Sequence, residues 1–289
     1  MTCKKQFEVL NWASLFLTEH HREQMVAELL LQYHTGQSRS AFFANMQEPI
    51  SADVFQQFKS DIEAHAKTGI PVQHLIGNTE FYGRMFRVNE HVLIPRPETE
   101  ELVYHVIQQV KEMGSMEEPI TIVDVGTGSG AIAITLALEL PDANIFAIDI
   151  STEAIAVAKE NAAMLGANVS FLTGDFLLPM IAKQRHANII VSNPPYIARE
   201  EEDALADTVK NFEPALALFA ADHGLAAYRT ISSQIKDVLL PGGMVAFEIG
   251  YTQGAAVKAM LLQTYPQCEA KVIQDINRKD RIVSAIFPT

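Results

Sequence analysis

The sequence predicts an α/β protein in which a doubly wound, mostly parallel sheet follows a small all-helical N-terminal domain. Three observations lead to that prediction. Residues 120–249 alternate short apolar runs with helical patterns, the N-terminal residues show helical periodicity only, and a segment with strand and turn signals lies between the two. Strands that are apolar throughout and separated by helices indicate a parallel sheet covered on both faces.

The helical domain is expected over residues 1–75. Apolar side chains recur at helical spacing over residues 25–33, and Gly36 ends that run. Ser51 is a suitable N-cap for a further helix, which Gly69 and Pro71 end. Both patterns favour amphipathic helices that pack on one another.

A β-hairpin linker is expected over residues 76–98, where aromatic and β-branched residues alternate with turn residues. The linker leads into Leu-Ile-Pro-Arg-Pro-Glu-Thr-Glu at residues 93–100. Because its two prolines disfavour regular structure, we expect the next helix to open at Glu98 or Thr99.

The third domain is expected over residues 99–289. Strands are predicted at 120–125, 144–150, 169–173, 189–192 and 244–249, with helices at 131–140, 152–165 and 225–239. The last helix is expected to end at the Pro-Gly-Gly of residues 241–243. Residues 271–276 and 282–287 are apolar runs with only a short link, which predicts an antiparallel pair at the sheet edge.

Composition narrows the class of protein. The 289 residues carry a formal net charge of −13, which disfavours the basic face that most nucleic-acid-binding proteins present. The two cysteines, Cys3 and Cys268, are far apart, and the nine histidines form no metal-like cluster, so no metal site is expected. With no signal-peptide pattern and no run of about 18 apolar residues, we expect a soluble cytoplasmic protein that does not bind membranes.

A glycine-rich turn stands between the first predicted strand and helix of the third domain. It reads Asp-Val-Gly-Thr-Gly-Ser-Gly over residues 124–130, and Asp149 ends the next strand. Glycines allow close backbone approach to a ligand, and an acidic residue at that separation is suited to ribose hydroxyls. The turn therefore predicts an adenosine-containing ligand, and by itself fits a methyltransferase and a dehydrogenase about equally.

The segment Asn193-Pro194-Pro195-Tyr196 follows the fourth predicted strand and favours methyl transfer. Two prolines hold the chain extended, so the Asn193 side chain and the Pro194 carbonyl offer two acceptors to one –NH₂ group, with Tyr196 as an aromatic wall. Two such acceptors suit the methylation of a planar amide or amino nitrogen. By binding both of its protons they favour a more tetrahedral nitrogen, whose lone pair then faces the methyl group. Catalysis would then rest on positioning, without a metal.

Because of these motifs, the chain resembles the HemK family of bacterial release factor glutamine methyltransferases. The resemblance covers nearly the whole chain and includes, in order, Pro-Val-Gln-His-Leu-Ile-Gly at 71–77, Glu-Phe-Tyr-Gly at 80–83, the proline-rich segment at 92–100, the glycine turn, Asn-Pro-Pro-Tyr-Ile at 193–197 and Phe-Glu-Pro at 212–214.

The resemblance implies a seven-stranded, Rossmann-like methyltransferase domain preceded by a helical domain that helps recognise the release factor. It implies S-adenosyl-L-methionine as cofactor and S-adenosyl-L-homocysteine as product. The residues implied for the cofactor are Gly126, Thr127, Gly128, Ser129, Gly130, Asp149, Asp175, Phe176 and Asn193. Those implied for the substrate glutamine, which lies in a Gly-Gly-Gln loop, are Asn193, Pro194, Pro195 and Tyr196, with Arg96 and Glu98 shaping the site. Among these, Asn193, Pro194 and Tyr196 are the expected catalytic residues, and the family expectation is a monomer without a direct nucleic-acid partner.

Three segments depart from the family pattern. Phe176 stands where many members have tryptophan, Asp222-His223-Gly224 replaces the more usual Asp-Gly order, and residues 275–281 lack a glycine often seen there. An aromatic wall is kept at Phe176, and we expect the other two departures to be surface variations. Two alternative enzymes stay open: a ribosomal-protein glutamine methyltransferase, and a nucleic-acid methyltransferase acting on adenine N6 or guanine N2. A non-catalytic binding module is disfavoured because both motifs are intact.

Overall fold

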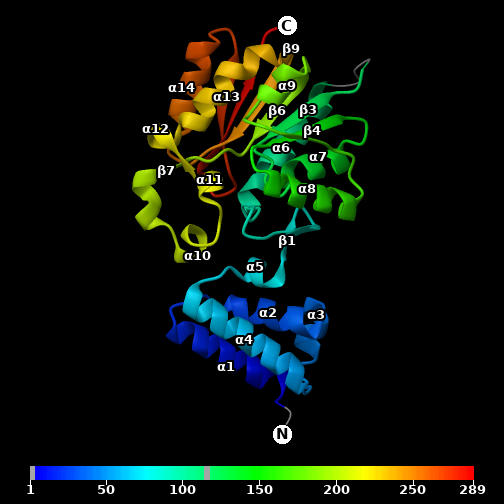
Figure 1. Cartoon of the computed structure of the whole chain (residues 1–289), viewed down its shortest axis with the longest axis vertical. Helices are drawn as coiled ribbons and strands as arrows, with labels where there is room; N and C mark the ends of the chain where they lie inside the picture. Colours follow the sequence, from blue (N-terminus) through cyan, green and yellow to red (C-terminus); the bar gives the residue numbers. More distant parts are fainter. Residues whose placement is uncertain (1–3, 114–117) are drawn as a thin grey trace. The chain divides into compact units, whose positions relative to one another are not determined.

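The computed structural model describes residues 4–113 and 118–289, which fold as two compact units (Figure 1). The first unit contains the chain up to Asn78 together with Ala206–Phe212, and the second contains Thr79–Leu205 together with Glu213–Thr289. A short segment from far along the chain thus belongs to the N-terminal unit. The boundaries at residues 75 and 98 that the sequence suggests stay a prediction.

The first unit is a bundle of helices: α1 (Gln6–Glu19), α2 (Met25–Thr35), α3 (Arg39–Ala44), α4 (Ala52–Thr68), α5 (Val72–Ile76) and α10 (Asp207–Lys210). The capping expectation is confirmed, since the Ser51 hydroxyl accepts from the Val54 amide at 3.2 Å and Gly69 ends α4 in a left-handed conformation. The core of the bundle includes Leu17, Leu30 and Phe58, all fully buried. The Arg22 guanidinium binds the Asp207 carboxylate with two bonds, of 2.6 and 2.7 Å, and so ties α10 to this unit.

The hairpin is confirmed, with strands β1 (Asn78–Phe81) and β2 (Arg84–Arg87) joined by two residues. Tyr82 and Gly83 both have positive φ, of 51° and 69°. A two-residue turn with positive φ at both positions matches the right-handed twist of the strands it connects.

The helix that follows, α6, spans Pro97–Met113 and begins earlier than expected. Proline is well suited to the first turn of a helix, because the amide it lacks has no partner there and its φ is already helical. The expectation that Glu98 or Thr99 opens this helix is therefore wrong. Thr99 instead lies inside the first turn and is buried.

The predicted fold class is confirmed by a seven-stranded sheet in the order β10-β11-β9-β6-β3-β4-β5. Its strands are β3 (Thr121–Val125), β4 (Asn144–Asp149), β5 (Ser170–Thr173), β6 (Ala187–Ser192), β9 (Leu239–Glu248), β10 (Glu269–Gln274) and β11 (Asp280–Ile286). Strand β11 runs antiparallel to both β9 and β10, which gives the expected antiparallel edge.

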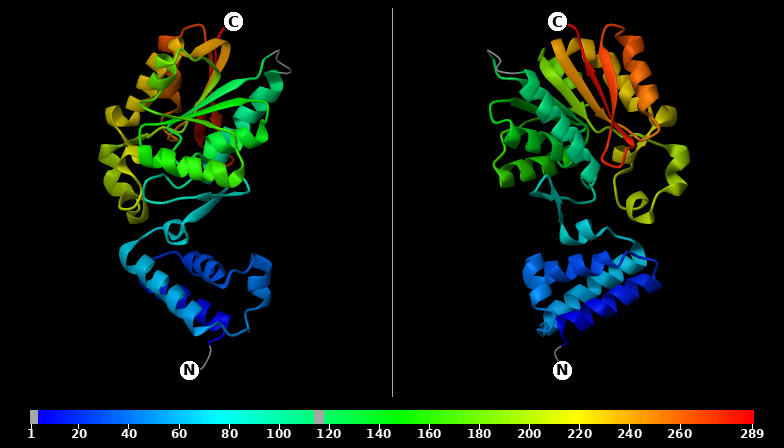
Figure 2. Two further views of the ribbon diagram at one scale, coloured as in Figure 1. Left: turned by 45° about the vertical axis from the view of Figure 1, so that its right-hand side comes forward. Right: turned by 180° about the vertical axis from the view of Figure 1, so that it is seen from behind.

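Helices cover both faces of this sheet (Figure 2). On one face lie α6, α7 (Ala131–Glu139) and α8 (Thr152–Leu165), and on the other α9 (Leu178–Ala182), α13 (Ala226–Gln234) and α14 (Gly254–Thr264). Alternate residues of each strand serve the two layers: Ile122 packs with α7 in one apolar cluster, and Val123 with Ile231 of α13 in the other.

The predicted end of a second helix is also wrong. The helix expected over residues 225–239 ends as α13 at Gln234, a 3₁₀ turn (Ile235–Asp237) follows, and the Pro-Gly-Gly of residues 241–243 falls within β9. The pairing of β6 with β9 is irregular there, since Ala187 lies opposite Leu239 but Ile189 lies opposite Met244. Proline and glycine thus mark a strand irregularity here, and the helix stops before them.

Short elements fill the connection between β6 and α13: β7 (Ile197–Ala198), a 3₁₀ helix (Arg199–Ala204), α11 (Ala215–Leu218), β8 (Phe219–Ala220) and α12 (Ala221–Gly224). Strand β7 pairs in parallel with β8. None of the helices in the described part of the chain is long and apolar enough to cross a membrane.

Candidate active site

The carboxyl ends of the parallel strands meet at one edge of the sheet, and a cavity of about 440 Å³ lies there. Protein cavities that bind small molecules commonly have volumes of roughly 300–1,000 Å³, and open α/β sheets bind ligands at this edge. Predicted site residues from five segments of the chain line it: Arg96, Gly126, Thr127, Gly128, Ser129, Asp149, Asp175, Phe176, Asn193 and Pro195. All of them belong to the second compact unit.

The glycine turn wraps one side of the cavity. Gly126, Gly128 and Gly130 have φ of 76°, 55° and 83°, in the region that glycine adopts without strain. A Cβ on Gly126 or Gly128 would meet nothing within 4 Å, so the space in front of their backbone is open to a ligand. Gly130 has a different role, because a Cβ there would lie 2.7 Å from Ile134 Cδ1. It permits close packing of α7 and does not line the cavity.

Asp149 fixes the same turn from the end of β4. One carboxylate oxygen accepts from the Gly128 amide at 2.8 Å and the other from the Ser151 amide at 2.9 Å. Burial raises the pKa of Asp149, and these backbone donors oppose that rise. Asp149 therefore supports the turn in addition to lining the cavity.

Replacement of Asp149 by alanine is expected to weaken cofactor binding by roughly 10- to 100-fold, because charge-assisted hydrogen bonds are worth about 1.5–3 kcal/mol each. Isothermal titration with S-adenosylmethionine measures the change. Glu153→Ala, in the exposed first turn of the following helix, is the matched control and should bind as the unmodified chain does. Equal binding by the two variants would contradict a role for Asp149 in this site.

The Asn-Pro-Pro-Tyr segment leaves β6 on the opposite side of the cavity. The Ser192 hydroxyl donates to the Val125 carbonyl at 2.5 Å, which ties the start of the segment to β3. Asn193 lines the cavity, and its Nδ2 donates to the Thr99 hydroxyl oxygen at 3.2 Å. Pro194 is buried and is not among the described residues that line the cavity.

Tyr196 lies differently from the aromatic wall that the sequence suggests. It is not among the described residues that line the cavity, and its ring packs against the apolar cluster on the α13 side of the sheet. Its carbonyl accepts from Gln253 Nε2 at 2.9 Å. Burial raises the pKa of the Tyr196 hydroxyl, and the neighbouring Glu248 carboxylate raises it further.

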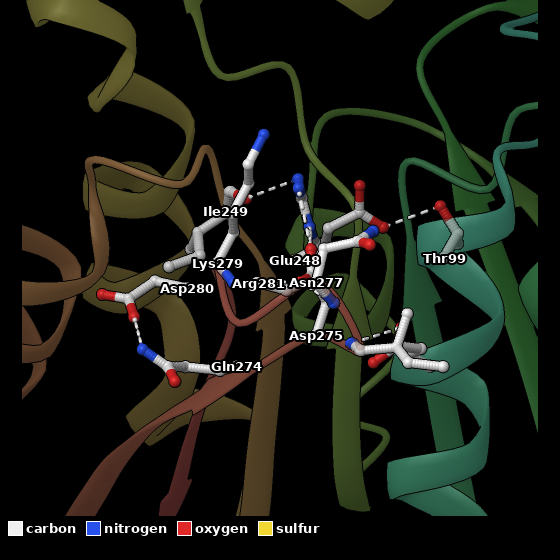
Figure 3. Close-up of polar contacts among 11 residues, drawn as sticks. Thr99, Glu248, Ile249, Gln274, Asp275, Asn277, Lys279, Asp280 and Arg281 are labelled. Carbon is white, nitrogen blue, oxygen red and sulfur yellow. Dashed lines mark hydrogen bonds and ion pairs between the residues drawn. The ribbon is translucent and has the colours of Figure 1, made fainter.

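The acidic residue that sequence reasoning missed is Glu248, the last residue of β9. Its side chain is buried, and one oxygen accepts from the Thr99 hydroxyl at 2.7 Å (Figure 3). A carboxylate inside an otherwise apolar strand is unusual, because an unpaired buried charge is costly. The charge at the end of the Met-Val-Ala-Phe-Glu-Ile run was the sequence signal for it.

A second missed residue, Glu213, organises the proline-rich segment. Its buried carboxylate forms an ion pair with Arg96 and accepts from the Ile94 amide at 3.1 Å. Arg96 therefore lines the cavity with its guanidinium already paired. Glu98 is partly exposed and is not among the described residues that line the cavity.

In the segment Asp222-His223-Gly224, the first two residues are exposed and Gly224 is buried. All three residues have positive φ, of 56°, 52° and 82°. Gly224 is buried against the Asn-Pro-Pro-Tyr segment of residues 193–196, here named the catalytic loop for its proposed role, and a Cβ on Gly224 would lie 2.1 Å from the Tyr196 carbonyl oxygen. The absence of a side chain at Gly224 thus allows this close approach to Tyr196.

Two buried carboxyl groups beside the cavity make folding stability depend on pH. Burial raises the pKa of Asp124 and of Glu248 to about 7, from ordinary values of 3.8 and 4.5. Between its ordinary and its raised pKa, each group holds a proton in the folded chain that the unfolded chain has released, so stability falls as the pH rises.

Each of these carboxyl groups is therefore expected to lower the free energy of unfolding by roughly 3 kcal/mol between about pH 4.5 and pH 7, and to add no further change above that. Urea unfolding followed across this range measures it. His105 and His65, whose pKa values burial lowers, make stability rise with pH over the same window, so the Glu248 contribution is taken as the difference between Glu248→Gln and the unmodified chain. Over this window the free energy of unfolding of Glu248→Gln should fall by roughly 3 kcal/mol less. The same pH dependence in both chains would contradict the assignment.

Comparisons with known proteins define the class to which this fold and cavity belong. Residues 117–280 match a methyltransferase domain family, and residues 8–77 match the PrmC N-terminal domain family. The catalytic domain of hMettl16, solved in complex with the MAT2A 3'UTR hairpin 6, covers 82% of each chain with a TM-score of 0.53 at 15% identity, a likeness of fold alone. The protein is a methyltransferase.

The particular family follows from curated relatives. The chain is 50% identical over 284 residues to the release factor glutamine methyltransferase of Bacillus subtilis, covering 98% of both chains, and 44% identical to that of Bacillus anthracis, covering 96% of this chain and 98% of the relative. The chain therefore belongs to the release factor glutamine methyltransferase family, and the predicted resemblance is confirmed. As in that family, S-adenosylmethionine is its methyl donor.

Proposed function

We propose that this chain transfers a methyl group from S-adenosylmethionine to the side-chain amide N5 of the glutamine in the Gly-Gly-Gln loop of class 1 peptide chain release factors. The single observation that carries the proposal is the position of Asn193. It lines the same cavity as the glycine turn, so the donor and the substrate amide would meet there.

The cavity residues fit the cofactor. The open space in front of Gly126 and Gly128 admits a ligand against the backbone, and Asp149 provides carboxylate oxygens at the same edge. Thr127 and Ser129 complete the turn, and Asp175 and Phe176 would lie beside the adenine. When bound, S-adenosylmethionine supplies the activated methyl group and leaves as S-adenosylhomocysteine.

The chain's own groups would bind and orient the substrate amide. The Asn193 side-chain carbonyl and the Pro194 main-chain carbonyl would each accept one proton of the glutamine –NH₂ group, with Pro195 keeping the loop extended. The methylated nitrogen releases its proton to solvent, so no general base is assigned. Arg96, held by Glu213, would shape the rim on the substrate side, with Glu98 near it.

Tyr196 contributes chiefly as a support in this proposal. Its carbonyl is bound by Gln253 and its ring packs against the apolar layer, which fixes the end of the catalytic loop. A rigid loop suits a reaction that depends on placing the amide nitrogen in line with the methyl group. The helical N-terminal unit, which matches the PrmC N-terminal domain family, would help recognise the release factor. We propose a monomer that works in the cytoplasm, where translation provides this substrate.

The test is methyl transfer from labelled S-adenosylmethionine to a purified release factor, a ribosomal protein preparation and DNA side by side, with fragment mass spectrometry to locate the label. Label on the Gly-Gly-Gln glutamine is the expected result. Label on a different protein glutamine would keep the chemistry and replace the substrate with a ribosomal protein. Label on DNA alone would overturn the proposal.

A further inference from the structure

A chain of hydrogen bonds connects Asn193 to a buried carboxylate through one hydroxyl group. The Thr99 Oγ1 donates to Glu248 Oε2 at 2.7 Å and accepts from Asn193 Nδ2 at 3.2 Å. The three residues lie on α6, the catalytic loop and the end of β9, separated by 94 and 149 positions in sequence. Thr99 and Glu248 are both almost fully buried, with exposed fractions of 4% and 1%.

The direction of this chain fixes which way the Asn193 amide faces. An ionised carboxylate can only accept, so Glu248 takes the proton of the Thr99 hydroxyl. The Thr99 oxygen is then left as an acceptor, and of the two ends of the Asn193 amide only the –NH₂ group can donate to it. The Asn193 carbonyl oxygen is thereby left for the cavity that this residue lines.

We propose that Thr99 and Glu248 are positioning residues for methyl transfer: their hydrogen-bond chain holds the Asn193 amide with its carbonyl oxygen toward the substrate. The inference rests on the proposed role of Asn193 as an acceptor for the substrate –NH₂ group. A flipped amide would present a donor to that group, which repels its protons and removes one of the two acceptors. Thr99 lines the cavity but would bind Asn193 and not the cofactor.

The surroundings of Glu248 hold it in place from several elements. The Tyr228 hydroxyl on α13 donates to the Glu248 main-chain carbonyl at 2.8 Å. Arg281 on β11 donates to the Ile249 carbonyl and to the Asp275 carboxylate (Figure 3). The same carboxylate also accepts from the Asn277 amide in the turn that follows Asp275. The charged and titratable groups that act on Glu248 are Arg281, which lowers its pKa, Glu98 on α6, which raises it, and the Tyr196 hydroxyl, which lowers it.

This arrangement also predicts a pH signature. With its pKa near 7, Glu248 gains a proton as the pH falls below neutrality and then no longer requires Thr99 as a donor. The Asn193 amide loses its fixed orientation, so kcat is expected to fall as the pH drops through about 7. A chain without the Thr99 hydroxyl should not show that step.

The test compares Thr99→Val, which keeps the shape and removes the hydroxyl, with Thr99→Ser, which keeps the hydroxyl. Thr135→Val is the matched control, because Thr135 is a buried threonine of α7 whose hydroxyl has no hydrogen-bond partner among the described residues. For each variant, kcat and KM for a purified class 1 release factor, the Kd of S-adenosylmethionine and the pH profile of kcat are measured. Asn193→Ala is assayed alongside, alone and combined with Thr99→Val.

We expect kcat of Thr99→Val to be about 10- to 100-fold lower, because misplacing one substrate-positioning group has an effect of that size. The Kd of S-adenosylmethionine should be unchanged, and kcat should show no step near pH 7. Thr99→Ser should recover most of kcat, Thr135→Val should match the unmodified chain, and the double variant should be no slower than Asn193→Ala alone.

Normal kcat in Thr99→Val, or equal losses of kcat in the valine and serine variants, would overturn the inference. The proposed function would still stand in that case if Asn193→Ala is slow. Normal kcat in Asn193→Ala would instead overturn the proposed catalytic role itself.

Discussion

Replacement of Asn193 by alanine is expected to lower kcat by about 10³-fold or more, because a single preorganised hydrogen-bonding group aimed at the reacting centre contributes about 10²–10³-fold and Asn193 also anchors the loop. The amide provides one of the two proposed acceptors for the substrate –NH₂ group and is bound by Thr99 at 3.2 Å. Without it, the substrate nitrogen keeps its planar form, whose lone pair is delocalised and weakly nucleophilic.

The measurement is the rate of methyl transfer to a purified release factor under single-turnover conditions, together with the Kd of S-adenosylmethionine. Binding should stay measurable, because the glycine turn and Asp149 lie on other strands. Asn188→Ala, on the strand β6 that leads to Asn193, is the matched control: the Asn188 side chain accepts from the Thr121 amide at 2.8 Å, and Asn188 is not among the described residues that line the cavity. Full activity in Asn193→Ala would remove the acceptor mechanism, whereas equal losses in both variants would indicate damage to β6.

Much of the fold could be predicted from the sequence because its signals are local. The run of apolar strands, the Ser51 cap and the glycine turn each depend on residues within a few positions of one another. The position of Asn193 at the cavity could also be predicted, because the carboxyl ends of parallel strands converge at one edge of the sheet.

The contacts that support the site could not be predicted, because they join residues far apart in the sequence. Arg96 and Glu213 are separated by 117 positions, and Thr99 and Glu248 by 149. The local pattern gave Thr99 the role of a helix cap, which Pro97 made unnecessary by starting the helix two residues earlier. Only the three-dimensional structure shows that this hydroxyl faces a carboxylate.

The backbone conformation of a turn is also not visible in the sequence. The segment of residues 275–281, which lacks a glycine often seen in the family, is exposed from Ile276 to Lys279, and Arg278 there has φ of 60°. That is the left-handed region, which costs a non-glycine residue roughly 1–2 kcal/mol. The hydrogen bonds that the Asp275 carboxylate accepts from the Asn277 and Lys279 amides hold this turn.

Replacement of Gly224 by alanine is expected to be the most damaging single-methyl change beside the catalytic loop. The new Cβ would lie 2.1 Å from the Tyr196 carbonyl oxygen and 2.7 Å from Gln253 Nε2, the pair whose hydrogen bond holds the end of that loop. Backbone atoms cannot yield as a flexible side chain can, so the loop itself must move. We expect a loss of about 10²-fold in kcat, the scale of a shift of about 1 Å in a positioned group.

Gly166→Ala separates this clash from the cost of backbone conformation. Gly166 has φ of 71°, close to the 82° of Gly224, but a Cβ there would meet nothing within 4 Å. Both variants should lose roughly 1 kcal/mol of unfolding free energy through the left-handed conformation, measured by urea unfolding. Only Gly224→Ala should also lose kcat and further stability, because only there does the methyl group displace the support of Tyr196. The same kcat in the two variants would show that methyl transfer tolerates a displaced Tyr196 carbonyl. The rigidity on which the proposed positioning depends would then lie elsewhere in the catalytic loop.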